Sequence, residues 1–279
     1  MIWRPAVQAD RPEIEMRLGA RPERAMFPLS NLRSFGFLED SDDRRAMRFW
    51  LSDAGVFGLS REGMAMPVLD DPDVAATIPL LIGGETVMGA LGPTVEARAL
   101  LRACRLDASD APMDADEPQF ALALDDLRMP RSDGLSLRSM AEKDLPLLAE
   151  WRFAFGTEVM GWDEGHRGRA AADAVRHLEG DAHRILMRDG APVAVTGFNA
   201  TLPEIVQVGG VFVPPELRRR GLARAAVALH LAEARNGGAA RATLCAASDN
   251  AARAYRSIGF ERCGDFAMCM LRTPQEVPS

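Results

Sequence analysis

Apolar residues follow two different spacings along the second half of the chain. Runs that are apolar throughout or at every second position predict strands, and they span 135–140, 183–200, 205–213, 241–247 and 260–271. Segments with apolar residues three or four positions apart predict helices, and they span 141–155, 169–180, 222–236 and 250–258. Because Asp189-Gly190 is a strong turn signal, we expect 183–200 to form a hairpin. The expected order of elements is βααβββαβαβ.

The first half of the chain shows a fainter version of the same plan. Its pattern predicts a helix at 21–35, a hairpin at 47–69, a turn and helix at 89–106, and a strand at 118–127. The polar segment 125–134 contains Pro130 and Gly134, and we interpret it as a linker. We therefore expect two domains, 1–127 and 135–272, each of the α/β class with a central mixed sheet flanked by helices.

Composition excludes several classes of protein. The chain has 279 residues, 47% of them hydrophobic, and no apolar run approaches the roughly 20 residues that span a bilayer. The first residues lack the basic and apolar regions of a secretion signal, so we expect a cytoplasmic protein without membrane contact. The four cysteines and four histidines lack the spacings typical of metal sites, so no metal is expected.

Charge is divided unevenly between the two halves. Residues 1–130 carry 14 arginines against 22 acidic residues, a net charge of −8, whereas residues 131–279 have a net charge of +1. A nucleic-acid-binding protein would show a basic domain, so we expect no nucleic-acid partner. Positive charge is only local, and it is densest at Arg218-Arg219-Arg220.

These three arginines stand where a predicted strand passes into a predicted helix. Pro214-Pro215 ends the strand, and Gly221 permits close approach of the backbone just before helix 222–236. The first N–H groups of a helix have no partner within it and lie at the positive end of its dipole, where cations alone are unfavourable. A diphosphate bound at this turn would balance the arginines. The alternative is a solvated helix start without a ligand.

Two motifs resemble those of a known superfamily. Arg218-x-x-Gly221-x-Ala223, which precedes a long helix, resembles the acyl-CoA signature of GNAT acetyltransferases. The later segment SDNAARAYRSIGFE is similar to their second motif, and the order of elements over about 135–272 is also theirs. The resemblance implies a tandem GNAT-like acyl-CoA N-acyltransferase fold with a degenerate first domain. In that domain we take GPTVEA, residues 92–97, as the comparable turn, without an arginine cluster.

The resemblance also implies a set of residues that bind acetyl-CoA. The backbone of the strand end would pair with the pantetheine arm, and the amides of the turn would hold the pyrophosphate, with the charge of Arg218 or Arg220 assisting. The residues concerned are Val211, Phe212, Val213, Arg218, Arg219, Arg220, Gly221, Leu222, Ala223 and Arg224. Gly209-Gly210 is expected to mark a bulge in the strand.

Two residues before Tyr255 are further candidates for contact with coenzyme A. The family commonly has an asparagine seven residues before this tyrosine, whereas here Asn250 is five before it and Ser248 is seven before it. At about 100° per residue, only a spacing of seven returns to the same helical face. We therefore expect Ser248 to face the cofactor, leave a contact by Asn250 open, and expect Asp249 to cap the helix.

The chemistry of acyl transfer points to further candidates. Tyr255 holds the position from which family members often protonate the coenzyme A thiolate; the alternative is that it only packs in the core. Family members often carry, on the strand before the turn, a carboxylate that acts as the general base. In this chain the polar side chain on that strand is Gln207. Glu204, Glu158 and water remain as alternative bases.

The leading hypothesis is an acetyl-CoA-dependent N-acetyltransferase that acts on a primary amine of a small molecule or peptide. The alternative is a non-catalytic acyl-CoA-binding sensor or scaffold. We expect the first domain to shape the substrate cleft or an interface, and a homodimer is one possible assembly. The loop with Glu158, Met160, Trp162 and Asp163 is expected to face the acceptor, although Trp162 is equally compatible with simple packing.

Overall fold

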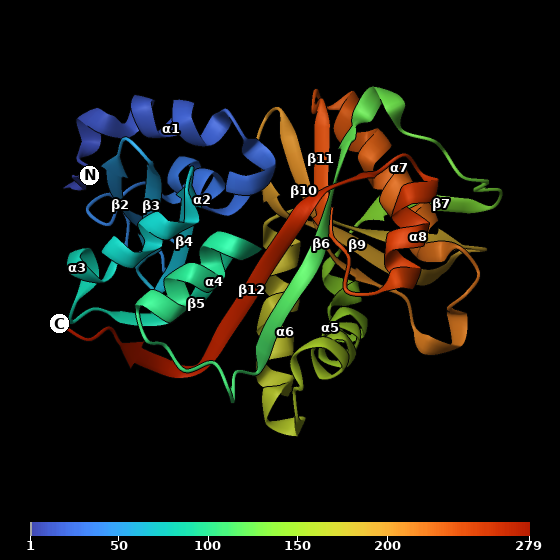
Figure 1. The fold of residues 1–279 in the computed structure, drawn as a ribbon. Helices are drawn as coiled ribbons and strands as arrows, with labels where there is room; N and C mark the ends of the chain where they lie inside the picture. Colours follow the sequence, from blue (N-terminus) through green and yellow to red (C-terminus); the bar gives the residue numbers. More distant parts are fainter. Residues whose placement is uncertain (1) are drawn as a thin grey trace. The chain divides into compact units, whose positions relative to one another are not determined.

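The computed structural model describes residues 2–279 and divides them into two compact units (Figure 1). Unit 1 contains residues 2–117 together with Gly264–Ser279, and unit 2 contains Pro118–Cys263. Among residues 2–279, no helix combines the length and the apolar character that crossing a membrane requires.

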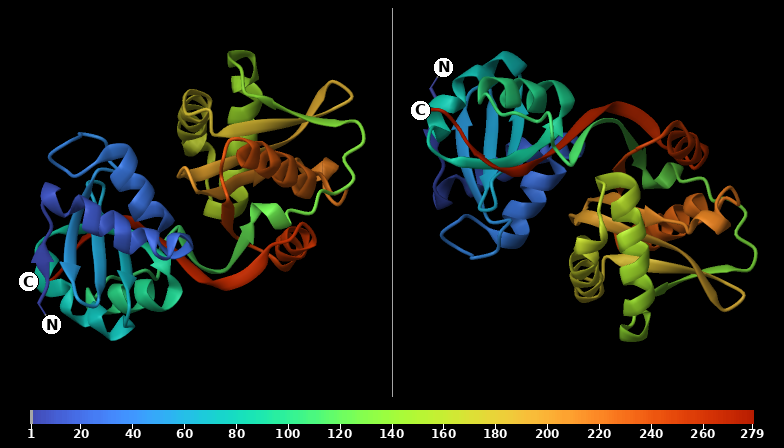
Figure 2. Two further views of the ribbon diagram at one scale, coloured as in Figure 1. Left: turned by 90° about the horizontal axis from the view of Figure 1, so that it is seen from above. Right: turned by 90° about the horizontal axis from the view of Figure 1, so that it is seen from below.

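Unit 1 is a mixed sheet with helices on both faces. Its strands are β1 (Arg4–Pro5), β2 (Met47–Ser52), β3 (Gly55–Ser60), β4 (Met64–Leu69), β5 (Thr86–Pro93) and part of β12 (Glu261–Glu276), in that spatial order. Helices α1 (Arg11–Gly19) and α2 (Pro22–Phe35) pack on one face; η2 (Pro72–Thr77), α3 (Pro79–Ile82) and α4 (Thr94–Ala103) pack on the other (Figure 2). The helix predicted at 21–35 is confirmed as α2, whereas the segment 47–69 holds three strands, because a second turn follows β3 at Arg61–Gly63.

Unit 2 is built in the same way. Its strands lie in the order β6 (Met113–Ala123), β11 (Arg241–Cys245), β10 (Ile205–Phe212), β9 (Ala191–Thr201), β8 (His183–Arg188) and β7 (Leu135–Ser139). Helices α5 (Leu145–Met160) and α6 (Arg167–Glu179) cover one face, and α7 (Leu222–Asn236) and α8 (Asp249–Ser257) cover the other. The predicted order βααβββαβαβ is confirmed from β7 to β12.

The last strand of each predicted domain lies in the other unit. Strand β6, expected to close the first domain, pairs antiparallel with β11 from Gln119 to Ala123. The last part of β12, expected to close the second domain, pairs with β5 from Phe266 to Glu276. The structure therefore corrects the bounds 1–127 and 135–272: residues 118–127 belong to unit 2 and residues 264–272 to unit 1. An apolar run shows that a strand forms, but not which sheet it joins.

The position of the parallel strand pair identifies the corresponding turns of the two units. In unit 2, β10 and β11 are parallel and α7 connects them. In unit 1, β4 and β5 are parallel, and the connection begins with Asp70-Asp71-Pro72-Asp73 and contains only η2 and α3. The comparable turn in the first half is thus this acidic segment and not GPTVEA, which forms the junction of β5 and α4.

The exchange of strands gives a test with paired substitutions. Leu271 is buried in unit 1 and Phe120 in unit 2. Leu271→Ala and Phe120→Ala should each destabilise by roughly 2–5 kcal/mol, because each removes a large side chain from a close-packed core. Hydrogen exchange should accelerate in β5 and α4 for Leu271→Ala, and in β10 and β11 for Phe120→Ala. The opposite pattern would contradict the assignment of the two strands.

Candidate active site

Strand β10 leaves its parallel neighbour before it ends. The pairing of β10 with β11 covers only Ile205 to Gln207, so the strands diverge beyond Gln207. On its other side, the register with β9 shifts between Gly209 and Phe212, and Gly210 has a left-handed φ of 62°. This confirms the predicted bulge at Gly209-Gly210. Its consequence is that the β11 side of Val211 and Phe212 lies outside the parallel ladder.

The turn after β10 has two left-handed residues close together. Arg219 has a φ of 62°, and Gly221, the N-cap of α7, has a φ of 74°. A left-handed conformation at an arginine costs about 1–2 kcal/mol, and such strain tends to occur at functional sites. Successive N–H groups around residues of this kind converge and form a site for an anion. The unpaired N–H groups at the start of α7, Leu222 to Arg224, begin immediately after this turn.

Arg218 has partners within the protein. Its Nη2 atom donates to both carboxylate oxygens of Glu158 at 2.7 and 2.8 Å, and its Nε atom donates to the carbonyl of Val213 at 2.9 Å. Both side chains of the ion pair are about two-fifths exposed, so we expect it to add only about 0–1 kcal/mol of stability. Its main effect is geometric, because it ties the last turn of α5 to the turn before α7. The arginines that present charge at the turn are therefore the exposed Arg219 and Arg220.

The start of α8 differs in part from the sequence prediction. Ser248, and not Asp249, is the N-cap: its hydroxyl accepts a hydrogen bond from the N–H of Ala251 at 3.2 Å. Asn250 is exposed in the first turn of the helix, and its side-chain oxygen accepts a hydrogen bond from Arg253. Serine is among the preferred N-cap residues because its side-chain oxygen can accept a hydrogen bond from the backbone N–H of the second or third helical residue.

Tyr255 lies on the buried side of α8. The residue is 8% exposed, and its ring makes an edge-on contact with Phe260, with centroids 6.1 Å apart. It belongs to the core cluster that also contains Val208 of β10 and Val227 of α7. Tyr255 therefore packs in the core, as one of the two alternatives from the sequence stated. This packing holds its ring against β10, which carries the bulge, and α7, which follows the turn.

Glu204 is far from the turn along the strand. It precedes β10, and its carbonyl accepts hydrogen bonds from the N–H groups of Ala240 and Arg241. At about 3.3 Å per residue, eight residues separate it from Phe212 by about 26 Å. The structure therefore does not bring the carboxylate of Glu204 together with the turn.

The structure reveals a histidine beside the bulge that sequence reasoning missed. His183 of β8 and Gly209 of β10 both pair with Gly197, and the imidazole lies over Gly197 and reaches Gly210. A Cβ at Gly197 would lie 2.2 Å from the His183 ring, so a side chain there would displace it. His177 of α6 stacks on this ring with centroids 3.8 Å apart. No local motif marks His183, because three strands bring it to the bulge.

Three buried polar atoms near the bulge have no partner. Among the described residues, Nδ1 of His183, Oγ1 of Thr196 and Oε1 of Gln207 are buried without a hydrogen bond. Burial lowers the pKa of His183 to about 2, so its imidazole is neutral at physiological pH. The side chain of Asn199 lies directly over Gly209. The bulge is thus surrounded by neutral polar groups and not by a carboxylate.

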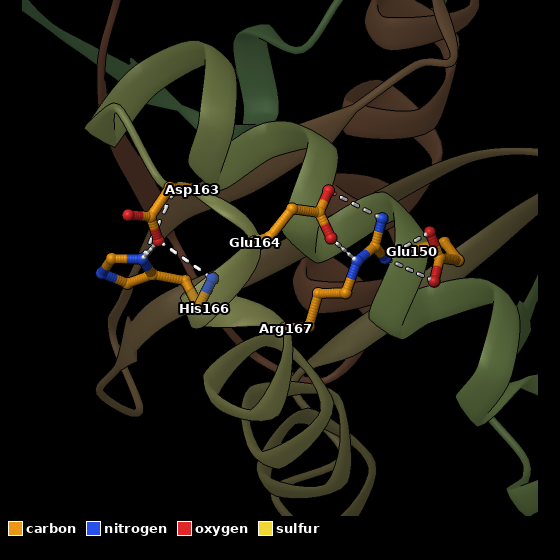
Figure 3. A network of polar contacts seen from close by, with 6 residues as sticks. Glu150, Asp163, Glu164, His166 and Arg167 are labelled. Atoms are coloured by element: carbon orange, nitrogen blue, oxygen red, sulfur yellow. Dashed lines mark hydrogen bonds and ion pairs between the residues drawn. The ribbon is translucent and has the colours of Figure 1, made fainter.

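The loop between α5 and α6 is held by its own contacts. Asp163 accepts hydrogen bonds from the N–H of Gly165 and shares a 2.7 Å contact with Nδ1 of His166, while Arg167 joins Glu164 to Glu150 (Figure 3). Trp162 is buried against Gly156, where a Cβ would lie 2.1 Å from the indole. The loop that was expected to face the acceptor therefore uses Trp162 for packing and Asp163 for capping.

Unit 1 carries a different arrangement at the corresponding place. The carboxylate of Glu96 is buried, accepts a hydrogen bond from the N–H of Leu69 at 2.8 Å and pairs with Arg24. Burial raises the pKa of this carboxyl group. The amide at the end of β4 is therefore already occupied by a side chain of the protein. The adjacent Asp70, Asp71 and Asp73 would repel a phosphate.

Comparison with known proteins agrees with this geometry. Residues 147–260 match the family model described as the acetyltransferase (GNAT) family. A Drosophila protein is 15% identical, with 97% of this chain and 98% of that chain covered and a TM-score of 0.62. A tandem GNAT protein from the clavulanic acid biosynthesis pathway is 16% identical, with 100% of this chain and 99% of that chain covered and a TM-score of 0.54. A GNAT-family acetyltransferase from Colwellia psychrerythraea is 12% identical, with 98% of this chain and 100% of that chain covered and a TM-score of 0.53.

These structural likenesses show the fold. The chain matches no curated protein. The predicted fold, a tandem GNAT-like arrangement with mixed sheets flanked by helices, is confirmed. In the part of the chain that the structure describes, no group of three or more His, Cys, Asp or Glu side chains is placed to hold a metal ion.

Three histidines of unit 2, of which His183 and His230 are buried and His177 is half-buried, predict a loss of stability in acid. Burial lowers the pKa of His177 to about 4 and that of His230 to about 3, and the pKa of His183 is lower still. Histidine in the unfolded chain titrates near 6.5, so stability is fully present above about pH 6.5 and falls as the unfolded state gains protons below it. Each histidine contributes up to about 1.4 kcal/mol per pH unit.

Urea unfolding at pH 7.5 and pH 5.0 measures this effect. His230 stacks on Phe198 with centroids 3.9 Å apart, so His230→Phe keeps an aromatic ring while removing the titration. The variant should lose about 1–2 kcal/mol less stability than the wild type between the two pH values. An equal loss in both proteins would show that His230 does not resist protonation.

Proposed function

We propose that unit 2, in which residues 147–260 match the model of the GNAT acetyltransferase family, transfers an acetyl group from acetyl-CoA to a primary amine of a small molecule or peptide. The observation that supports this most directly is the combination of a bulged β10, which leaves β11 after Gln207, with a left-handed turn at the start of α7. The strand offers unpaired backbone groups and the turn offers converging N–H groups, the two features that an acyl-CoA requires.

The residues at this place fit acetyl-CoA. We assign the backbone of Val211, Phe212 and Val213 to the pantetheine arm and the amides from Arg219 to Arg224 to the diphosphate. Arg219 and Arg220 supply charge beside them, whereas Arg218 holds the turn in place through Glu158. Ser248 and Asn250 remain proposed contacts at the start of α8, although each already has a hydrogen bond within the helix.

The reaction needs a neutral amine and a proton for the leaving thiolate. The amine nitrogen attacks the thioester carbonyl carbon, the C–S bond breaks, and the backbone N–H near Phe212 stabilises the oxyanion. We propose that Tyr255 gives its proton to the thiolate and regains one from solvent. Since Gln207 replaces a carboxylate and Glu204 is remote, water takes the proton of the amine, and neutral His183 accepts a hydrogen bond from the amine as it approaches.

We further propose that each chain binds one acetyl-CoA. Unit 1 lacks the arginine turn, its corresponding connection is acidic, and Glu96 occupies the N–H of Leu69. This unit then contributes to the acceptor cleft or to an interface and not to cofactor binding.

Calorimetric titration of acetyl-CoA tests the turn. Gly221→Trp should abolish binding, because a side chain at a φ of 74° strains the turn and covers its amides. Gly134→Trp is the matched control: Gly134 has a φ of 70°, but nothing lies within 4 Å of a Cβ there. The wild type and the control should bind one equivalent. Two equivalents, or binding that survives in Gly221→Trp, would count against the proposed site.

Turnover with a panel of amines tests Tyr255 and the base. Tyr255→Phe should lower kcat by about 10²-fold or more while leaving the Kd of acetyl-CoA unchanged. The variant lacks the hydroxyl proton that the thiolate would receive, but it keeps every residue of the turn assigned to acetyl-CoA. With water as the base, kcat/KM of the wild type should rise with pH up to the pKa of the acceptor amine. A plateau well below that pKa would point to a titrating group of the protein. Binding of acetyl-CoA without turnover of any amine would favour the alternative, a non-catalytic acyl-CoA-binding sensor or scaffold.

A further inference from the structure

Unit 2 contains a cavity of about 550 Å³ that the proposed reaction does not use. It lies between the second half of α7, the β9–β10 connection and the start of β8, and all its lining residues belong to unit 2. Phe198, Val206 and Ala234 provide apolar surface, and Asp181, Arg184 and Glu233 provide charge.

The cavity is distinct from the site proposed for acetyl-CoA. His230, Glu233 and Ala234 line it from the C-terminal half of α7, and Gly237 lines it from the C-cap, whereas the arginine turn precedes the first residue of that helix. His230 is the lining residue of α7 nearest the turn, and it lies six residues, or about 9 Å along the helix axis, beyond Arg224. None of the residues assigned to the diphosphate lines the cavity.

The inner wall of the cavity is aromatic and contains an unused polar atom. The His230 ring lies parallel to that of Phe198, with centroids 3.9 Å apart and an interplanar angle of 18°. His230 is 2% exposed, and its Nδ1 atom has no hydrogen-bond partner among the described residues. Such a wall suits the apolar body of a small ligand, and aromatic faces also attract organic cations.

The charges around the cavity favour a cation. Arg184, whose side chain is 13% exposed, donates to Glu233 through Nε at 2.8 Å and to Asp181 through Nη1 at 2.9 Å. Two carboxylates thus face one guanidinium, which leaves an excess of one negative charge. The C-terminal end of α7 adds a partial negative charge at the same place. An anion such as coenzyme A is disfavoured here for the same reason.

We propose that this cavity is a second binding site of unit 2 for a small organic amine. The ammonium group lies beside Glu233 and Asp181, and the apolar body lies against Phe198, Val206 and the His230 ring. The site is independent of acetyl transfer, and it requires neither acetyl-CoA nor turnover.

Binding of phenethylamine to the full chain, followed by calorimetry and saturation-transfer NMR without acetyl-CoA, tests the proposal. Phenethylamine should bind saturably, and hydrocinnamate, an anion of similar size, should not. Ala234→Phe should weaken binding about tenfold or more, because the ring fills the cavity. Glu233→Gln should weaken it about fivefold, because one carboxylate of the rim is lost.

Two controls separate this site from any other amine site. Ala172→Phe adds the same ring at an exposed position of α6, and Glu142→Gln removes an exposed carboxylate outside the cavity; both should bind phenethylamine as the wild type does. Equal binding of amine and anion, or amine binding that neither Ala234→Phe nor Glu233→Gln weakens, would overturn the proposal. If Ala234→Phe does not fold, Glu233→Gln alone decides, because it removes no packing volume.

Discussion

The divergence of β10 from β11 is the constraint on which the rest of unit 2 depends. Parallel strands normally satisfy each other's backbone groups along their whole length, but here the pairing stops after Gln207. The bulge at Gly209-Gly210 turns the strand away, and glycine is needed because Asn199 lies over Gly209 and Gly210 has a positive φ. The strand end and the start of α7 then offer unpaired groups beside each other, and a ligand that carries both acceptors and negative charge can satisfy them.

The contacts of Arg218 change how the arginine cluster is understood. A cluster of three cations at a helix start suggested three equivalent partners for a diphosphate, but Arg218 is bound by Glu158 and by the carbonyl of Val213. One arginine therefore holds the turn against α5, and its neighbours remain exposed. This division of roles also accounts for Glu158, whose carboxylate serves as a partner of Arg218 and is engaged before any substrate arrives.

The two units share one plan but differ in the local charge of one connection. Each has a parallel strand pair followed by a connection that begins at a strand end. In unit 2 that connection starts with arginines and a long helix; in unit 1 it starts with aspartates and short helical turns, and the buried carboxylate of Glu96 occupies the N–H of Leu69.

The amino-acid sequence by itself determined the elements of the second half, their order and the position of the turn, because apolar spacing and glycine conformation act over a few neighbouring residues. It also indicated the bulge at Gly209-Gly210, and it offered the burial of Tyr255 as one of two alternatives. Only the tertiary structure decided which sheet β6 and β12 join, which turn of the first half corresponds to the arginine turn, and that His183 lies at the bulge while Glu204 does not. Those outcomes depend on pairing between strands far apart in the chain, such as β8 with β9 and β5 with β12, and no local pattern specifies the partner.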